Sequence, residues 1–219
     1  MPPRLPVAVL VSGEGTTLDA LAERAAAGEL PIDVRLVVSD RASAPALEKA
    51  RRRGLEAIVL PSRGVDPETW GRQLSAELEA RGVALVVLAG FLTILPPGWV
   101  AGWRGRALNL HPSLLPKYGG PGMYGPRVHA AVLAAHERET GVTVHLVTGD
   151  VDGGPPLAQE RVAVEPDDTP ATLRARLHPV EVRLLAETIR KFAEGVWPLP
   201  YPDPEPRLPR GADRPRRAR

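Results

Sequence analysis

The sequence predicts an α/β protein with a doubly wound, mostly parallel sheet whose N-terminal half is Rossmann-like. Between residues 5 and 111, apolar runs of strand length alternate regularly with segments of helical periodicity. The first run, residues 5–11, leads into a glycine turn and then a helical segment. The run at residues 84–89 is apolar throughout, as expected for a strand that is covered on both faces.

Length and composition indicate one domain, residues 1–197, followed by a Pro- and Arg-rich tail, residues 198–219, which we expect to be extended or disordered. The 219 residues are 43% apolar, which is enough for a substantial core. A formal charge of +2 and an aromatic content of 4% argue against nucleic acid as a partner. The chain has no cysteine, which excludes disulfides and thiolate nucleophiles. No apolar run spans a membrane and no signal-peptide pattern is present, so we expect a cytoplasmic protein.

The predicted elements follow from apolar periodicity and from helix-end signals. Strands are expected at residues 5–11, 34–38, 57–60, 84–89, 106–108, 141–147 and 159–164. Helices are expected at residues 18–28, 44–53, 67–81, 127–135 and 171–194. Gly28 and Gly54 are candidates for helix C-caps, and Pro170 after two aspartates and a threonine is typical of a helix start.

The glycine turn after the first strand, Ser12-Gly-Glu-Gly-Thr-Thr17, would point backbone N–H groups at an anion. It lacks the third glycine of the dinucleotide fingerprint, so a single phosphate suits it better than a whole cofactor. A tight turn with an N-cap and no ligand explains the stretch equally well. Asp40, after the second strand, could bind a ribose in such a fold, although turn chemistry is the simpler role.

The stretch Asn109-Leu-His-Pro-Ser-Leu-Leu-Pro116 is the candidate for chemistry. Residues two apart on a strand project to the same side, so Asn109 and His111 would lie together. An amide that holds an oxyanion beside an imidazole that moves a proton is suited to acyl transfer. The alternative is that both side chains only cap a turn at the strand end.

Polar groups later in the chain could join this pair. His145 shares one face of a predicted strand with Thr143, and it either faces the cleft or is a structural histidine. A carboxylate on the glycine-rich turn that follows could orient the imidazole and raise its pKa. Asp150 and Asp152 are both candidates, and spacing does not choose between them.

Two loops complete the candidate site. Residues 90–97 leave a buried strand at the sheet edge where such folds bind ligands, and they are either an apolar pocket wall or ordinary core. The glycine-rich stretch 118–125 is either a lid or a long connection.

Three segments together, 12–18 (Ser-Gly-Glu-Gly-Thr-Thr-Leu), 109–116 and 152–154 (Asp-Gly-Gly), resemble the phosphoribosylglycinamide formyltransferase family. The resemblance spans roughly residues 7–195, so it implies a formyltransferase domain at 1–197 with the formyltransferase fold. It implies 10-formyltetrahydrofolate as the co-substrate that donates the formyl group. The acceptor would be the primary amine of glycinamide ribonucleotide, in de novo purine biosynthesis.

The resemblance also implies residue roles. Asn109, His111 and Asp152 match the catalytic trio, which favours Asp152 over Asp150. The substrate-binding positions it implies are Gly15, Thr16 and Thr17 for the phosphate and Glu181 for the nucleotide. The folate-binding positions it implies are Leu92, Thr93, Ile94 and Leu95 at the pterin and Thr143 and His145 nearby.

In the mechanism that this implies, the amine attacks the formyl carbon and Asn109 donates to the oxyanion. Protonated His111 stabilises the intermediate and supplies a proton to the leaving nitrogen, while Asp152 keeps His111 charged. We expect no metal, because the histidines lack ligand spacing such as HxxxH. A monomer or a homodimer is expected.

The chain departs from the family pattern in several places. Thr17 stands where Asn is common, and Glu14 places a negative charge beside the phosphate, so we expect its side chain to point to solvent. The basic residue that often holds the folate tail has no clear counterpart, and Arg63 and Arg72 are the candidates. The loop after Tyr118 is longer than in many members.

Three other functions deserve comparison. A methionyl-tRNA formyltransferase would carry a further RNA-binding domain, whereas only a short tail follows residue 195 here. A formyl-folate hydrolase would use water as the acceptor, and such enzymes usually lack this phosphate loop. A non-catalytic nucleotide-binding module of Rossmann type would explain neither the incomplete glycine fingerprint nor the presence of all three catalytic positions.

Overall fold

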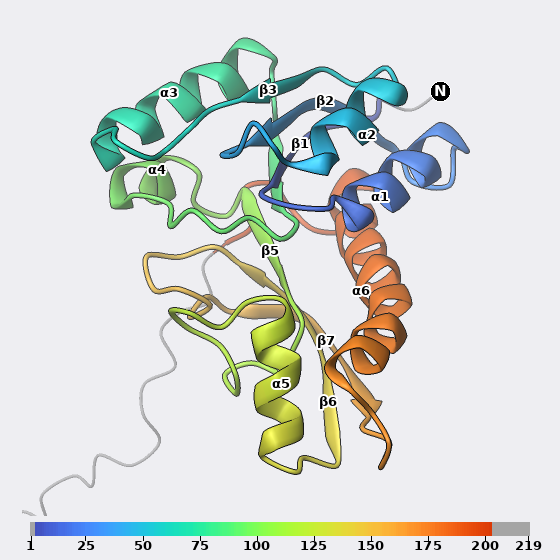
Figure 1. The fold of residues 1–219 in the computed structure, drawn as a ribbon. Coiled ribbons are helices and arrows are strands. Elements are labelled where there is room, and N and C mark those ends of the chain that lie inside the picture. The colour runs from blue at the N-terminus through green and yellow to red at the C-terminus, as the bar shows by residue number, and fades with distance from the viewer. Residues whose placement is uncertain (1–2, 203–219) are drawn as a thin grey trace, which may run out of the picture.

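The computed structural model describes residues 3–202, which form one α/β unit (Figure 1). The strands of this part of the chain are β1 Leu5–Val11, β2 Ile32–Ser39, β3 Ala57–Val59, β4 Leu85–Leu88, β5 Ala107–His111, β6 Glu139–Leu146 and β7 Pro156–Ala163. They make a single sheet in the order β3-β2-β1-β4-β5-β6-β7. The prediction of a doubly wound, mostly parallel sheet is confirmed.

The direction of the strands changes along this sheet. Strands β1 to β5 pair in parallel, whereas β6 and β7 join as an antiparallel hairpin against β5. The order reverses at β1, which lies between β2 and β4, and ligands bind at such a switch point in open α/β sheets. A ligand site is therefore expected at the sheet edge formed by the carboxyl ends of β1, β4 and β5.

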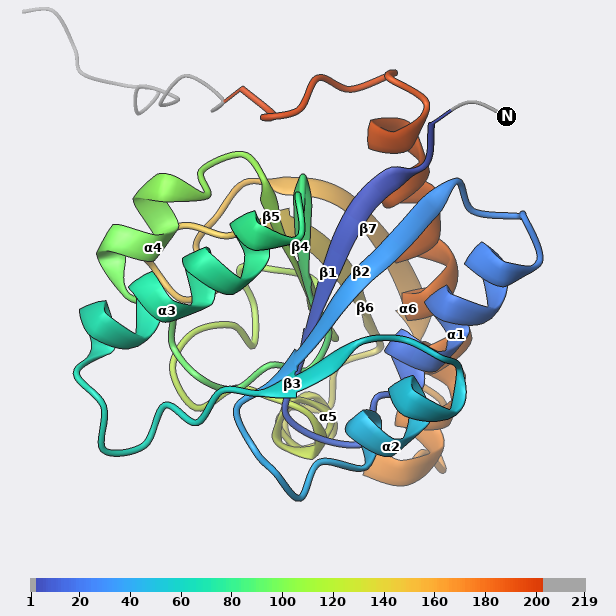
Figure 2. The ribbon, with the colours of Figure 1, turned by 90° about the horizontal axis from the view of Figure 1, so that it is seen from above.

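Helices cover both faces of the sheet, as Figure 2 shows from above. They are α1 Thr16–Ala26, α2 Pro45–Arg52, α3 Pro67–Ala80, α4 Pro97–Gly102, α5 Pro126–Ala134 and α6 Pro170–Ala193. One core cluster joins the sheet to α1, α2, α5 and α6, and a second joins it to α3 and α4. Along β1 the fully buried Val7 and Val9 belong to the first cluster, and Ala8 and Leu10 belong to the second. This alternation is what a strand covered on both faces requires.

The helix α4 was not predicted from the sequence. Its six residues include two glycines and begin at the second of two consecutive prolines, which is a composition typical of a loop. Trp99 and Trp103 stack there with centroids 5.8 Å apart, and both are buried, so tertiary packing overrides the weak local signal. Strand β5 also extends through His111, beyond the predicted end at residue 108.

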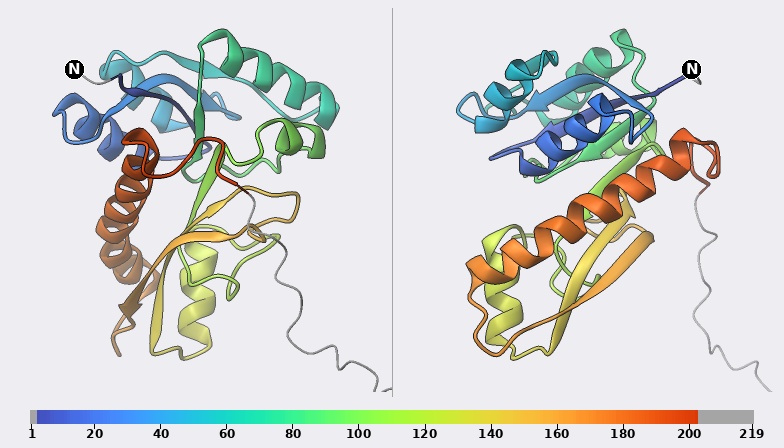
Figure 3. Two further views of the ribbon diagram at one scale, coloured as in Figure 1. Left: turned by 180° about the vertical axis from the view of Figure 1, so that it is seen from behind. Right: turned by 90° about the vertical axis from the view of Figure 1, so that its right-hand side faces the viewer.

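Residues 198–202, which the sequence places at the start of the tail, contact the domain (Figure 3). Tyr201 donates its backbone N–H to the carbonyl of Gly105 at 2.8 Å. Its ring packs edge to face with Phe192 and Trp197. The rest of the predicted tail, residues 203–219, lies outside the described residues. Within residues 3–202, none of the helices is both long enough and apolar enough to cross a membrane.

Candidate active site

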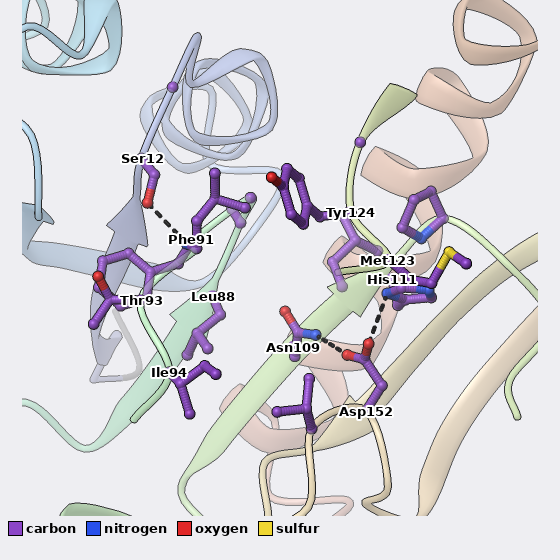
Figure 4. Close-up of a pocket in the computed structure, with 18 of the residues that line it drawn as sticks. Ser12, Leu88, Phe91, Thr93, Ile94, Asn109, His111, Met123, Tyr124 and Asp152 are labelled. Atoms are coloured by element: carbon purple, nitrogen blue, oxygen red, sulfur yellow. Dashed lines mark hydrogen bonds and ion pairs between the residues drawn. The ribbon is translucent and has the colours of Figure 1, made fainter. Parts of the chain in front are cut away.

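A cavity of about 670 Å³ opens at the carboxyl ends of β1, β4 and β5. Its walls come from the loop after β1, the segment after β4, the end of β5, the loop before α5, the turn after β6 and helix α6. Figure 4 shows Asn109, His111 and Asp152 together on one side of it, with Leu88, Phe91 and Ile94 across from them. The three predicted catalytic positions, which lie far apart in the sequence, thus share one cleft.

Asn109 and His111 project from β5 into this cavity, as the period of two in a strand predicts. In the register of the sheet, Asn109 lies opposite Leu88 of β4 and His145 of β6. The imidazole of His111 is buried, with a side-chain exposure of 4%. The strand end therefore presents an amide and an imidazole from a rigid element.

Asp152 comes from the turn that links β6 to β7, where its φ of 55° lies in the left-handed region. Its Oδ1 accepts a hydrogen bond from Asn109 Nδ2 at 3.1 Å, and its Oδ2 accepts one from Gly120 N at 3.0 Å. Oδ2 also lies 3.5 Å from Nδ1 of His111. Asp150 is exposed at the rim of the cavity, so the geometry selects Asp152 as the carboxylate beside the imidazole.

The protonation of this pair depends on burial and on the neighbouring groups. Burial lowers the pKa of His111, and it outweighs the attraction of the Asp152 carboxylate and the hydrogen bond to the Tyr118 carbonyl, which both raise it. In the free protein the Asp152 carboxylate therefore favours the charged imidazole without offsetting the effect of burial. Burial raises the pKa of Asp152, but the contacts with His145, His111 and Gly120 together lower it below its ordinary value. A neutral imidazole thus faces an ionised carboxylate at neutral pH.

Hydrogen-bond partners fix where the neutral ring of His111 carries its proton. Nε2 lies 2.8 Å from the carbonyl oxygen of Tyr118, which can only accept, so Nε2 donates. Nδ1 is then the basic nitrogen, and it is the one that faces Asp152. A proton taken up there would be stabilised by the carboxylate at once.

The amide of Asn109 uses both of its N–H groups within the protein. Nδ2 lies 3.0 Å from Nε2 of His145 and 3.1 Å from Oδ1 of Asp152. His145 donates from Nδ1 to the carbonyl of Leu146 at 2.9 Å, so its Nε2 is the acceptor when the ring is neutral. His145 lines the cavity and orients the amide, so of the two alternatives left open by the sequence it is the one facing the cleft that the structure shows.

The loop predicted to bind phosphate lines the other end of the cavity. Gly15, Thr16 and Thr17 all border it, and Gly15 is the N-cap of α1 with a φ of 67°. The N-terminus of α1 therefore opens into the cavity, where backbone N–H groups and the helix dipole favour an anion. The Glu14 side chain is 62% exposed, as predicted.

The apolar wall is formed by the segment after β4. Leu92, Thr93, Ile94 and Leu95 all line the cavity, and Ile94 is 66% exposed at its mouth. The Thr93 hydroxyl donates to Asp40 Oδ2 at 2.8 Å and lies 2.9 Å from the Ser62 hydroxyl. Asp40 thus anchors this segment, in place of the turn role suggested by the sequence.

Two predicted positions have different surroundings. Thr143 is fully buried and does not border the cavity; its hydroxyl donates to the carbonyl of Ser113 at 2.6 Å and accepts from Leu115 N at 3.1 Å. It therefore shapes the segment after His111 from behind. Glu181 of α6 does line the cavity, with Oε2 3.4 Å from Nδ1 of His178.

The structure adds lining residues that sequence reasoning missed. His129 of α5 is 2% exposed, and its Nδ1 has no hydrogen-bond partner among the described residues. Arg174 of α6 also borders the cavity. Nothing in their spacing points to a site, since α5 and α6 reach the cavity only through tertiary packing.

A second, smaller cavity adjoins the apolar wall and shares Arg41, Leu92 and Thr93 with the first. Arg63 lines it, whereas Arg72 borders neither cavity and donates to the Thr69 hydroxyl on the surface. Of the two candidates for holding a folate tail, only Arg63 adjoins the site. In residues 3–202 no group of three or more His, Asp or Glu side chains is placed to hold a metal ion.

Comparison with known proteins identifies the class to which this fold and site belong. The chain belongs to the formyl transferase family, whose model matches residues 5–189. Within that family it belongs with the phosphoribosylglycinamide formyltransferases, and it is an enzyme of purine biosynthesis that transfers a formyl group.

Individual relatives support this placement. The phosphoribosylglycinamide formyltransferase of Escherichia coli strain K12 is 37% identical over 190 residues, 86% of this chain and 87% of that protein. The chloroplastic enzyme of Arabidopsis thaliana is 37% identical over 195 residues, 88% of this chain and 67% of that protein. The solved structure of glycinamide ribonucleotide transformylase 1 from Symbiobacterium toebii aligns with a TM-score of 0.83 and 37% identity, covering 89% of this chain and 90% of that one.

Proposed function

We propose that the protein transfers the formyl group of 10-formyltetrahydrofolate to the primary amine of glycinamide ribonucleotide. The observation that carries this proposal is the convergence of Asn109, His111 and Asp152 on one cavity. One end of that cavity is the N-terminus of α1, which suits the substrate phosphate. The opposite apolar wall suits a flat pterin ring.

The proposed reaction is a direct transfer. The amine nitrogen bonds to the formyl carbon, and the bond from that carbon to the folate nitrogen then breaks. The amine loses one proton and the folate nitrogen gains one, so a single group that accepts and returns a proton suffices. His111 is suited to this role because burial keeps it neutral and Nδ1 is its basic nitrogen. The proposed mechanism therefore starts from a neutral His111, whereas the family resemblance implies a protonated one.

Asp152 and Asn109 complete the proposed mechanism. The ionised Asp152 stabilises the imidazolium that forms while His111 holds the proton. Asn109 donates to the tetrahedral oxyanion, for which the substrate takes over one of the N–H groups now bound by His145 and Asp152. Removal of one such donor typically costs about 3–4 kcal/mol in the transition state.

In this proposal the folate tail lies beyond the pterin wall. Arg63 and Arg41 line the smaller cavity that adjoins Leu92 and Thr93. Two guanidinium groups there would match the carboxylates of a glutamate tail. This supports Arg63 as the residue that holds the tail and leaves Arg72 without that role.

A comparison of acceptors tests the proposed function. The purified protein is incubated with 10-formyltetrahydrofolate and either glycinamide ribonucleotide, charged methionyl-tRNA or water alone, and loss of the formyl group is followed. We expect rapid formylation of the ribonucleotide and at most slow hydrolysis. Preferred transfer to tRNA or to water would assign the site to a different formyl-folate enzyme, and no turnover with any acceptor would leave a binding protein.

A further inference from the structure

The loop after β1 is held from behind by helix α2. The N–H of Ala46 donates to the carbonyl of Gly13 at 3.1 Å, and the ammonium of Lys49 donates to the carbonyl of Glu14 at 2.7 Å. The next carbonyl, that of Gly15, accepts from Asp19 N in the first turn of α1 at 3.0 Å. Three successive carbonyl groups of the loop are therefore fixed by helices.

These contacts also fix the direction of the N–H group that follows each carbonyl. A trans peptide is planar, so its N–H points opposite to its C=O. Because the carbonyls of Gly13 and Glu14 face α2, the N–H groups of Glu14 and Gly15 point away from α2. These residues line the cavity, so their N–H groups are aimed at the place where an anion would lie.

The loop after β1 is closely packed against helix α2. A Cβ on Gly15 would lie 2.5 Å from Cβ of Ala46, so loop and helix already touch. The Lys49 side chain is only 24% exposed, so most of it packs against the protein surface. An ordinary surface ion pair contributes little, but Lys49 differs because its main contact is a backbone oxygen of the loop.

Lys49 also faces the one negative side chain of the loop. Its Nζ lies 3.9 Å from Oε2 of Glu14. A phosphate bound at the N-terminus of α1 would be repelled by that carboxylate, and a cation held beside it offsets the repulsion. A single lysine therefore shapes the loop and offsets its unfavourable charge.

We propose that Lys49 is a positioning residue that sets the affinity of the loop for the phosphate of the acceptor substrate. This deepens the proposed function and rests on it. Lys49 acts through the loop backbone and does not itself border the cavity. Its effect therefore falls on binding of the phosphorylated substrate, whereas formyl-donor binding and the proton transfers at His111 are unaffected.

Four proteins test this proposal: the wild type, Lys49→Met, Lys49→Arg and Arg53→Met. Arg53 is the matched control, because it also ties α2 to α1 through Asp19 and Glu23 but does not touch the loop. We expect Lys49→Met to raise KM for glycinamide ribonucleotide on the order of tenfold, with kcat and KM for the formyl donor within about twofold. Lys49→Arg keeps a donor and a charge and should restore most of the affinity, and Arg53→Met should leave this KM unchanged.

A binding measurement makes the inference testable apart from activity. Inorganic phosphate is titrated into each protein by calorimetry, and we expect weaker binding only in Lys49→Met. Equal phosphate affinity and equal KM in the wild type and Lys49→Met would overturn the inference, as would an equal loss in Arg53→Met. If the wild type does not formylate the ribonucleotide but phosphate binding still depends on Lys49, then the proposed function is wrong and the role of Lys49 in anion binding stands.

Discussion

The hydroxyl of Ser12 accepts a hydrogen bond from the backbone N–H of Leu92 at 2.8 Å (Figure 4). Ser12 begins the loop that is proposed to bind the substrate phosphate, and Leu92 belongs to the apolar wall. Ser12 also donates its backbone N–H to the carbonyl of Gly90 at 3.1 Å. The two ends of the cavity are thus tied together by one residue.

Replacement of Ser12 by alanine should weaken binding of the formyl donor. It leaves the N–H of Leu92 without its partner in a half-buried segment, which costs about 1–3 kcal/mol. We expect KM for 10-formyltetrahydrofolate to rise about five- to tenfold, more than KM for the ribonucleotide. Steady-state kinetics measure both. Ser75→Ala is the control, because its hydroxyl accepts from Trp103 Nε1 far from the cavity, and an equal effect there would point to general destabilisation.

Loss of either strand-borne side chain should abolish most turnover. An oxyanion donor and a placed acid–base group each contribute at least about two orders of magnitude in rate. We therefore expect Asn109→Ala and His111→Ala each to lower kcat by about 10² or more, with circular dichroism spectra like that of the wild type. A purified and folded variant that turns over at the wild-type rate would remove that residue from the mechanism.

The pH profile distinguishes a basic from an acidic role for His111. Its pKa is lowered by burial, so a mechanism that starts from the neutral ring stays active through neutral pH and loses activity as the pH falls below about 6.5. A mechanism that starts from the protonated ring would instead lose activity as the pH rises. Asp152 raises the pKa of His111, so this pKa should be lower still in Asp152→Asn. The residual activity of that variant should therefore be lost at a lower pH than the activity of the wild type. Profiles of kcat/KM against pH, at constant ionic strength, measure both shifts.

Stability should also depend on pH through the buried histidines. Burial lowers the pKa values of both His111 and His129 in the folded protein. The unfolded chain then binds more protons below its ordinary imidazole pKa of about 6.5, so stability is present above that pH and is lost progressively below it. The lowered pKa of Asp152 has its effect in a separate range, below its ordinary value of 3.8.

Urea denaturation at pH 8, 7, 6 and 5 measures this dependence. We expect the free energy of unfolding to fall between pH 7 and pH 5 in the wild type and to fall less steeply in His129→Phe, which removes one of the two groups. If the free energy of unfolding of the wild type instead rises as the pH is lowered from 7 to 5, the buried histidine rings are protonated in the folded protein.

The fold followed from the sequence because its signals are local. Apolar runs and glycine C-caps such as Gly28 and Gly54 identify elements from a few neighbouring residues. Helix α4 was missed because its helical state depends on the stacking of Trp99 and Trp103 against α3, which local composition does not reveal. The shared side of Asn109 and His111 was predicted from a local signal of the same kind, the period of two in a strand, whereas the roles of the other site positions came from the family resemblance.

The features of the site that the sequence did not reveal depend on contacts between residues that are far apart in the chain. Spacing left Asp150 and Asp152 equivalent until the resemblance and then the hydrogen bond to Asn109 separated them. The protonation of His111 depends on how deeply the ring is buried, which only the packed structure determines. Thr143 illustrates the same limit, because its hydroxyl serves the backbone of the segment after His111 and not the cavity.

The bond between Asp152 and the N–H of Gly120 has a consequence for how this enzyme can be varied. The Asp152 oxygen that lies 3.5 Å from Nδ1 of His111 also accepts from Gly120 N at the start of the glycine-rich loop, so a change in the length of residues 112–120 would disturb this contact. Extra residues are better accommodated further on, between Gly120 and Pro126, where most residues are exposed and the segment ends at the start of helix α5. An engineer who wishes to graft a new segment over the mouth of the cavity should cut there.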